Sequence, residues 1–167
     1  TAAGVQAQLF SNRNLMARAV LPDLLAACAG GAPTPETKDG CAALRGWDRR
    51  WGVASVPTSV AVFWGEAMWA LAEASDEDDG LSVYDGMLAH TTPAAKLGAL
   101  DSAVAKLSAD FGKWDTVWGE INRFQRLDGA IEPHFDDSKP SLPVGFTSGQ
   151  WGWLASFGAR AWPGTKR

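Results

Sequence analysis

The residue types that could supply a nucleophile and a base are thinly spread along this 167-residue chain. Thr1 could act as its own base through a free α-amino group, but such a nucleophile opens a buried strand, and the residues after Thr1 read as a helix. The histidines, His90 and His134, fall in separate loop-like regions, and no Gly-x-Ser-x-Gly elbow is present. A triad of His134 and Asp136 with any serine would only combine common residues. The sequence therefore predicts no catalytic residue within this chain.

Acidic residues suggest two further kinds of site, and neither has the required spacing. The run over 76–80 is rich in Asp and could be read as a calcium loop, but it does not follow the EF-hand pattern and suits a solvated turn. Glu120 with Glu132 or Asp137 could form the carboxylate pair of a glycosidase, yet nothing in the sequence fixes their separation. We expect solvent-facing carboxylates, with no metal site and no cofactor site.

Cys28 and Cys41 are the two cysteines of the chain, and they flank one Gly- and Pro-rich stretch. In an oxidising compartment they would form a disulfide that closes a loop of ~14 residues, which contributes roughly 3 kcal/mol in the chain-entropy account. The alternative is two separate buried thiols. A metal site is disfavoured because no third or fourth soft ligand lies near in sequence.

Composition limits the class of protein. With 46% hydrophobic and 20% charged residues the chain reads as one soluble globular domain, and its net charge of −4 argues against a nucleic-acid-binding surface. No apolar run approaches the ~20 residues that a membrane-spanning helix needs. Nine Trp residues indicate either a thick core or a surface on which ring-shaped ligands stack, and we expect a core.

Helical patterns cover the first 126 residues. The clearest helix begins at Pro93, after Thr92, ends before Gly112, and has an apolar stripe made of Leu97, Leu100, Val104, Leu107 and Phe111. A helix over 13–29, capped by Ser11 and Asn12, should kink at Pro22. The other expected elements are the end of a helix over 2–9, a loop over 30–40, a short helix over 42–47, and a helix over 58–74 that is apolar on most of its circumference.

The character of the chain changes toward its end. Residues 114–126 have no helical stripe and should pack against the preceding helix before entering a strand. Turns follow over 127–143, and residues 142–162 suit strands whose partner strands lie elsewhere. We therefore divide the chain into a helical region, 1–126, and a strand and loop region, 127–167. Both ends look as if they lie partway through something larger.

A succession of short motifs resembles the β chain of the penicillin acylase family of N-terminal-nucleophile hydrolases, in its branch of N-acyl-homoserine-lactone and aculeacin acylases. No single motif is strong, but their order and spacing hold over nearly the whole chain. The matching runs are Val5-Gln6-Ala7-Gln8, Asn12-Arg13, the run from Val20 to Cys28, the run from Cys41 to Asp48, Phe63-Trp64, Phe111-Gly112-Lys113-Trp114-Asp115, Trp118-Gly119-Glu120-Ile121-Asn122-Arg123 and Leu142-Pro143-Val144.

The resemblance implies an α+β fold in which this mainly helical segment completes a four-layer αββα architecture. It implies a self-cleaving, exported precursor, periplasmic or secreted, whose catalytic Ser begins the β chain upstream of this segment. Asn12 and Arg13 follow that catalytic region and do not replace its oxyanion Asn. The partners would be the other segments of the precursor and a small acylated substrate, with N-acyl-homoserine lactone ahead of a β-lactam or lipopeptide.

This segment alone would be structural and inactive. After Pro143 the run Gly145-Phe146-Thr147-Ser148-Gly149-Gln150-Trp151 replaces a more glycine-rich loop, so the substrate side stays open. The alternative function is a stand-alone, Trp-rich carbohydrate-binding or interaction module without catalysis.

Overall fold

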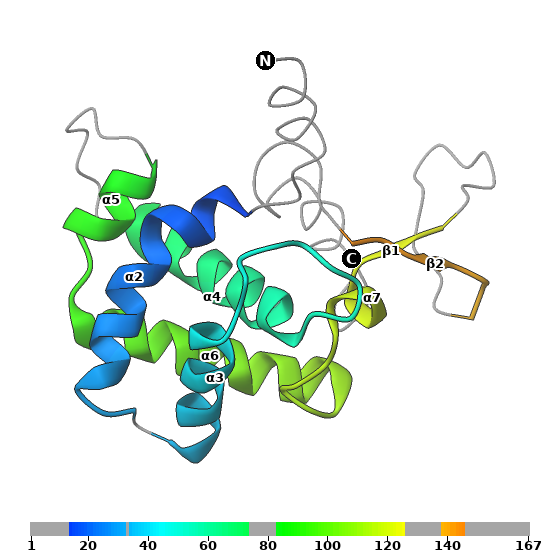
Figure 1. Ribbon diagram of the computed structural model, residues 1–167, viewed down its shortest axis with the longest axis horizontal. Coiled ribbons are helices and arrows are strands. Elements are labelled where there is room, and N and C mark those ends of the chain that lie inside the picture. The colour runs from blue at the N-terminus through cyan, green and yellow to red at the C-terminus, as the bar shows by residue number, and fades with distance from the viewer. Residues whose placement is uncertain (1–13, 33, 74–82, 126–137, 146–167) are drawn as a thin grey trace.

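The computed structural model describes residues 14–32, 34–73, 83–125 and 138–145, and these residues form a mainly helical structure with a small antiparallel ribbon (Figure 1). This agrees with the expected α+β class. The elements are, in chain order, α2 (Leu15–Ala29), α3 (Pro35–Arg45), α4 (Val56–Glu73), α5 (Val83–Ala89), α6 (Pro93–Phe111), α7 (Trp118–Ile121), β1 (Arg123–Phe124) and β2 (Leu142–Pro143).

Helix α6 has the predicted start and stop because both signals are local. The Thr92 side chain accepts a hydrogen bond from the backbone N–H of Ala95, and Pro93 occupies the first turn, where its missing N–H costs nothing. Gly112 ends the helix at φ 82°, a left-handed conformation that glycine adopts without strain. The predicted stripe faces the core, with Leu100, Val104 and Leu107 buried and Leu97 and Phe111 partly buried.

The predicted cap of α2 is wrong by two residues. Asn14, rather than Ser11 or Asn12, has the extended backbone of a cap, and its side-chain oxygen accepts from the Ala17 N–H at 2.8 Å. Pro22 lies inside this helix, and the kink expected there stays a prediction. The buried face contains the predicted residues, with Ala17, Val20, Leu21, Leu24 and Cys28 buried and Leu25 partly buried.

Helix α3 corrects the expected loop over 30–40 and the expected helix over 42–47. Thr34 caps the helix by accepting from the Thr37 N–H at 3.1 Å, and Pro35 begins it, so the helix starts seven residues before the predicted position. Gly40 lies within the helix because α3 approaches its neighbours closely there. A Cβ atom at Gly40 would lie 3.3 Å from Cγ2 of Val104.

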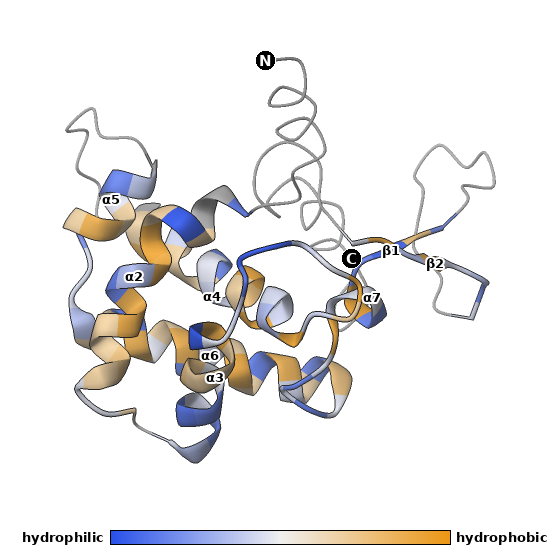
Figure 2. Ribbon diagram, in the orientation of Figure 1, coloured by the Kyte–Doolittle hydropathy of each residue, from blue (hydrophilic) through white to orange (hydrophobic). Residues whose placement is uncertain are grey.

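Helix α4 is the centre of the bundle. It contacts α3, α5, α6 and α7, and its side chains Val60, Val62, Trp64 and Met68 are buried, which confirms the expected all-round apolar surface. Figure 2 shows apolar segments of α2, α4 and α6 facing one another. The indole Nε1 of Trp64 donates to the backbone carbonyl of Lys96 at 3.1 Å and so connects α4 to the start of α6.

The two short strands pair with each other. Arg123 faces Pro143 and Phe124 faces Leu142 in antiparallel register, which confirms a strand after Trp118. The expectation that partner strands lie elsewhere is wrong for β2, because the Val144 N–H donates to the Asn122 carbonyl and aligns the two strands. Helix α7 was not expected, since four residues are too few to show a stripe. The elements expected over 2–9, 127–137 and 146–162 lie outside the described residues.

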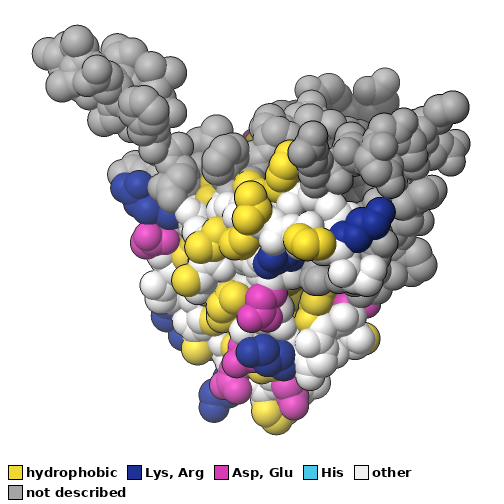
Figure 3. Space-filling model, turned by 90° about the vertical axis from the view of Figure 1, so that its right-hand side faces the viewer, with side chains coloured by type: hydrophobic (Ala, Val, Ile, Leu, Met, Phe, Trp, Pro, Cys, Tyr) yellow, Lys and Arg dark blue, Asp and Glu magenta, His cyan; other side chains and the backbone are white. Residues whose placement is uncertain are grey.

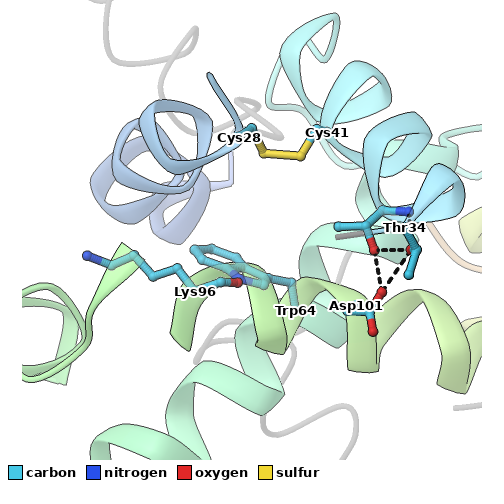
Figure 4. Close-up of a disulfide and its surroundings, with 7 residues drawn as sticks. Cys28, Thr34, Cys41, Trp64, Lys96 and Asp101 are labelled. Carbon is cyan, nitrogen blue, oxygen red and sulfur yellow. Dashed lines mark hydrogen bonds between the residues drawn. A yellow bond between two sulfur atoms is a disulfide. The ribbon is translucent and has the colours of Figure 1, made fainter. Parts of the chain in front are cut away.

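A disulfide joins the end of α2 to the middle of α3 (Figure 4). Cys28 and Cys41 are both buried, and their Cα atoms lie 6.1 Å apart, within the usual range for a bridge. The alternative of two separate thiols is therefore wrong. The disulfide connects neighbouring helices whose inner faces also pack together.

The close approach of α7 to the preceding loop predicts opposite effects of alanine at two glycines. A Cβ atom at Gly119 would lie 2.9 Å from both Cβ and the carbonyl oxygen of Val53, so Gly119→Ala should lower the free energy of unfolding by about 2 kcal/mol or more. Gly98 lies in α6, where a Cβ atom would have no neighbouring atom within 4 Å. Gly98→Ala should therefore raise the free energy of unfolding by about 0.5–1 kcal/mol. Urea unfolding measures both, and equal effects would contradict the assigned packing.

The disulfide predicts a loss of stability on its removal. The double variant Cys28→Ala/Cys41→Ala should unfold with a free energy roughly 3 kcal/mol lower, because the 13-residue separation is no longer closed in the unfolded chain. Wild-type protein unfolded in the presence of a reductant is the matched control and should behave like the variant. An unchanged urea midpoint in both samples would show that the bridge contributes nothing.

Candidate functional site

Most of the candidate residues identified in the sequence lie outside the described part of the chain. They are Thr1, Asn12, Arg13, the acidic run over 76–80, Glu132, His134, Asp136, Asp137 and Ser148. Their roles therefore stay as predicted.

The structure describes His90 and Glu120, and it does not bring them together. His90 follows α5 and is half-buried, whereas Glu120 is exposed on α7. Figure 1 places α5 and α7 at opposite ends of the bundle. Over the residues with an assigned structure, no group of three or more His, Cys, Asp or Glu side chains lies close enough together to hold a metal ion.

A carboxylate clasp is the most developed polar cluster. It consists of Thr34, Thr37 and Asp101 (Figure 4). One carboxylate oxygen of Asp101 accepts from the Thr37 hydroxyl at 2.6 Å and from the Thr34 hydroxyl at 2.9 Å. Thr34 is also the cap of α3, so the carboxylate lies at the positive end of that helix, where negative charge is favourable. The clasp fixes the start of α3 against the middle of α6.

These contacts change the acidity of Asp101. The hydrogen bond from Thr37, followed by that from Thr34, stabilises the charged carboxylate and holds its pKa below the ordinary value, and partial burial opposes the shift. Because the pKa is lowered on folding, the clasp stabilises the protein above the ordinary pKa of Asp. This stabilisation is lost as the pH falls through the folded-state pKa.

Lys96 forms a second polar connection, from α6 to α2. Its side chain is only 6% exposed, and its Nζ lies 3.1 Å from Oδ2 of Asp23, which is itself half-exposed. Water can therefore reach one side of the pair, while the aliphatic stem of Lys96 packs in the interior. Removal of Asp23 alone would leave a buried charge without its partner, which is the costly way to break such a pair.

Arg123 forms the third connection and anchors the ribbon. Its guanidinium donates to the Gly119 carbonyl at 2.9 Å, to the Ser141 carbonyl at 2.6 Å and to the Ser141 hydroxyl at 2.7 Å. The side-chain amide of Asn122 adds a bond to the Val144 carbonyl at 2.9 Å. Side-chain hydrogen bonds, rather than a long ladder of backbone hydrogen bonds, hold the two strands beside α7.

Local sequence signals mark only part of these three connections. Thr34 followed by Pro35 is a helix-start signal that marks the cap, but the expected loop over 30–40 passed over it. Asp101 lies 64 residues from Thr37, so no nearby sequence pattern marks Asp101 as the hydrogen-bond acceptor of the two threonines. Lys96 and Arg123 likewise bond to groups that only the fold brings near.

Trp side chains mostly build the core, as expected. Trp47, Trp51, Trp64 and Trp118 are buried, and the rings of Trp51 and Trp118 pack with centroids 5.8 Å apart. Trp114 is partly buried against the same cluster. No described Trp provides an open platform for a sugar ring.

Exposed apolar side chains gather instead around the ribbon. Phe124 is 61% exposed, Leu142 67% and Val53 43%. Val53 lies beside Gly119 and Pro143, whereas Phe124 and Leu142 face each other across the ribbon on its other face. Figure 3 shows hydrophobic side chains in the upper and middle parts of the coloured surface of the face that it draws, with charged side chains beside and below them. We call the pair Phe124 and Leu142 the ribbon patch.

The clasp predicts a pH-dependent cost for removing one hydroxyl. Thr37 is fully buried, so Thr37→Val keeps its shape and should lower the free energy of unfolding by about 1 kcal/mol at neutral pH. The difference from wild type should shrink below the ordinary pKa of Asp, since protonated Asp101 no longer benefits from both bonds. Urea unfolding of the variant and the wild type at several pH values measures this difference in the free energy of unfolding.

A matched control lies on the same helix. Asp110 pairs with Lys106 at 2.7 Å on α6, and because the Lys106 side chain is 53% exposed, water screens the pair and Asp110→Asn should change stability by less than about 1 kcal/mol. A Thr37→Val penalty that stayed constant from neutral to acid pH would contradict the role of the Asp101 charge.

Comparison with known proteins identifies the family of the chain. A search of curated proteins found no match. No helix among the residues that the structure describes is long and apolar enough to cross a membrane. The family model of penicillin amidase matches residues 1–154, which is most of the chain. This agrees with the succession of motifs over the same span and supports an acylase-type amide hydrolase. The chain belongs to the penicillin amidase family.

Proposed function

We propose that this chain is a scaffold segment of an enzyme that hydrolyses the amide bond of an N-acylated substrate. The observation that carries the proposal is the family match over residues 1–154. The substrate favoured by the resemblance is an N-acyl-homoserine lactone, and a β-lactam or lipopeptide is the alternative within the same chemistry. The net reaction would consume one water and cleave the amide C–N bond, and the products would be a carboxylic acid and a free amine.

The structural role is supported by what the polar side chains do. Asp101, Lys96 and Arg123 each connect two elements of the bundle through short hydrogen bonds. Groups held in this way keep helices in place and are not presented to a ligand. The catalytic Ser, its α-amino base and the oxyanion donors would come from upstream sequence, as the resemblance implies.

The ribbon patch supports a larger assembly. A two-stranded ribbon is marginal in water without further strands or a covering layer. Here each strand has two residues, and the apolar pair Phe124 and Leu142 lies open. The proposed partners are the other segments of one processed precursor. Residues 1–126 would supply covering helices, and residues 127–167 would return to the shared sheet of an αββα fold.

The disulfide supports an exported enzyme. Such bridges form and persist in oxidising compartments such as the bacterial periplasm or the extracellular space. A stand-alone carbohydrate-binding module has less support, because the described Trp rings are buried or partly buried.

The proposal predicts that the purified 167-residue chain is inactive. Hydrolysis of an N-acyl-homoserine lactone, followed by release of the free amine, should stay at the uncatalysed rate. The enzyme purified from its natural source should hydrolyse the same compound. Intact mass and N-terminal sequencing should then identify a chain that begins with Ser among the co-purifying polypeptides.

Two outcomes would contradict the proposal. Turnover by the isolated chain would place catalytic groups within these residues. Purification of this chain alone from the source, without partner polypeptides, would favour a self-contained module.

A further inference from the structure

Helix α3 has a small apolar face. Its buried residues are Thr37, Gly40, Cys41 and Leu44, and Leu44 is the one large aliphatic side chain among them. The charged side chains of α3 are all exposed. A helix of 11 residues is marginal in water, and Gly40 lowers its helix propensity further. We therefore expect contacts other than apolar burial to decide whether α3 stays docked on the bundle.

Two links of this kind hold α3. The disulfide between Cys28 and Cys41 joins its middle to α2, and the carboxylate clasp joins its start to Asp101 on α6. Figure 4 shows the two links at separate points along the helix. The middle of α3 stays beside α2 while the disulfide is intact, and its start stays on α6 while the clasp is intact. Release of the whole helix therefore requires the loss of both links.

Helix α3 covers the place where α4 and α6 meet. A Cβ atom at Gly40 would lie 3.3 Å from Cγ2 of Val104, 3.8 Å from Cδ1 of Leu100 and 3.9 Å from Cγ1 of Val60. Leu100 and Val104 belong to α6 and Val60 belongs to α4, and all three side chains are buried. Release of α3 would bring these apolar side chains into contact with water.

The two threonine hydroxyls determine the acidity of Asp101. On the same helix, Lys96 and Lys106 form ion pairs with Asp23 and Asp110. The other charged side chains described on α2, α3 and α4 have no ion pair or hydrogen bond with Asp101, and they are Arg18, Glu36, Lys38, Asp39, Arg45 and Glu66.

Protonation of Asp101 weakens the clasp. A hydrogen bond to a charged acceptor is roughly twice as strong as a bond to a neutral one. The bonds from Thr37 and then from Thr34 hold the pKa of this carboxylate below its ordinary value. The clasp is therefore at full strength at neutral pH and weakens as the pH falls through the folded-state pKa.

We propose that α3 is a redox-gated conformational switch, which stays docked while either link is intact and opens when the disulfide is reduced and Asp101 is protonated. A dithiol supplies the reduction: it gives two electrons and two protons, so that Cys28 and Cys41 become thiols and the dithiol becomes a disulfide. The proton on Asp101 comes from solvent. This inference does not depend on the proposed function.

Single-residue hydrogen exchange on the full chain tests the switch at neutral pH. The samples are the wild type and Asp101→Asn, each with the disulfide oxidised and reduced. The readout is the protection of the Leu44 amide in α3 divided by that of the Val62 amide in α4. Asp101→Asn should lower this ratio at least ~10-fold in the reduced protein and less than about twofold in the oxidised protein, where the bridge still holds α3.

Two further variants serve as controls. Asp110→Asn removes the ion pair with Lys106 on the same helix and should leave the ratio unchanged in the reduced protein. The double variant Cys28→Ala/Cys41→Ala lacks the bridge without any dithiol. Asp101→Asn added to this double variant should lower the ratio as much as it does in the reduced wild-type background.

Two outcomes would overturn the switch. An equal fall of the ratio in oxidised and reduced Asp101→Asn would show that the bridge does not gate α3. Equal loss of protection in α3 and α4 of the reduced variant would show that α3 opens only with the whole bundle. In the reduced wild type the ratio should also fall as the pH drops through the folded-state pKa of Asp101, and the same fall in reduced Asp101→Asn would contradict the role of this carboxylate.

Discussion

The burial of Trp64 between α4 and α6 is the constraint on which the helical bundle depends. The side chain is fully buried, and a buried indole N–H without an acceptor would cost free energy. The Lys96 carbonyl supplies that acceptor, and the bond holds the start of α6 beside the middle of α4. The helices α2 and α3 then pack on the surface that this pair creates.

Polar side chains in this protein define position more than they add stability. Asp101 fixes where α3 begins, Lys96 fixes α2 against α6, and Arg123 fixes the ribbon against α7. Apolar packing alone allows a helix to slide or rotate at little cost, whereas a hydrogen bond at a defined distance does not. Two of the three connections start from α6 and the third starts from β1, so α2, α3 and the ribbon each have one fixed point.

Sequence reasoning predicted the parts of the fold that depend on nearby residues. The bounds of α6 follow from Thr92, Pro93 and Gly112, which all act within one turn. It missed the start of α3 because Gly40, a weak helix former, lies inside the helix for the sake of contact with Val104. It missed the acceptor role of Asp101 because 64 residues separate it from Thr37. The two-residue strands are too short for any alternation to show.

The single disulfide also determines how oxidation of this segment can proceed. Within these 167 residues two thiols have one intramolecular product, so no wrong pairing has to be broken and remade. The bridge joins consecutive helices, α2 and α3, which both precede α6 in the chain. In an oxidising compartment, an oxidant can therefore close this bridge once α2 and α3 have packed together, before α6 is in place.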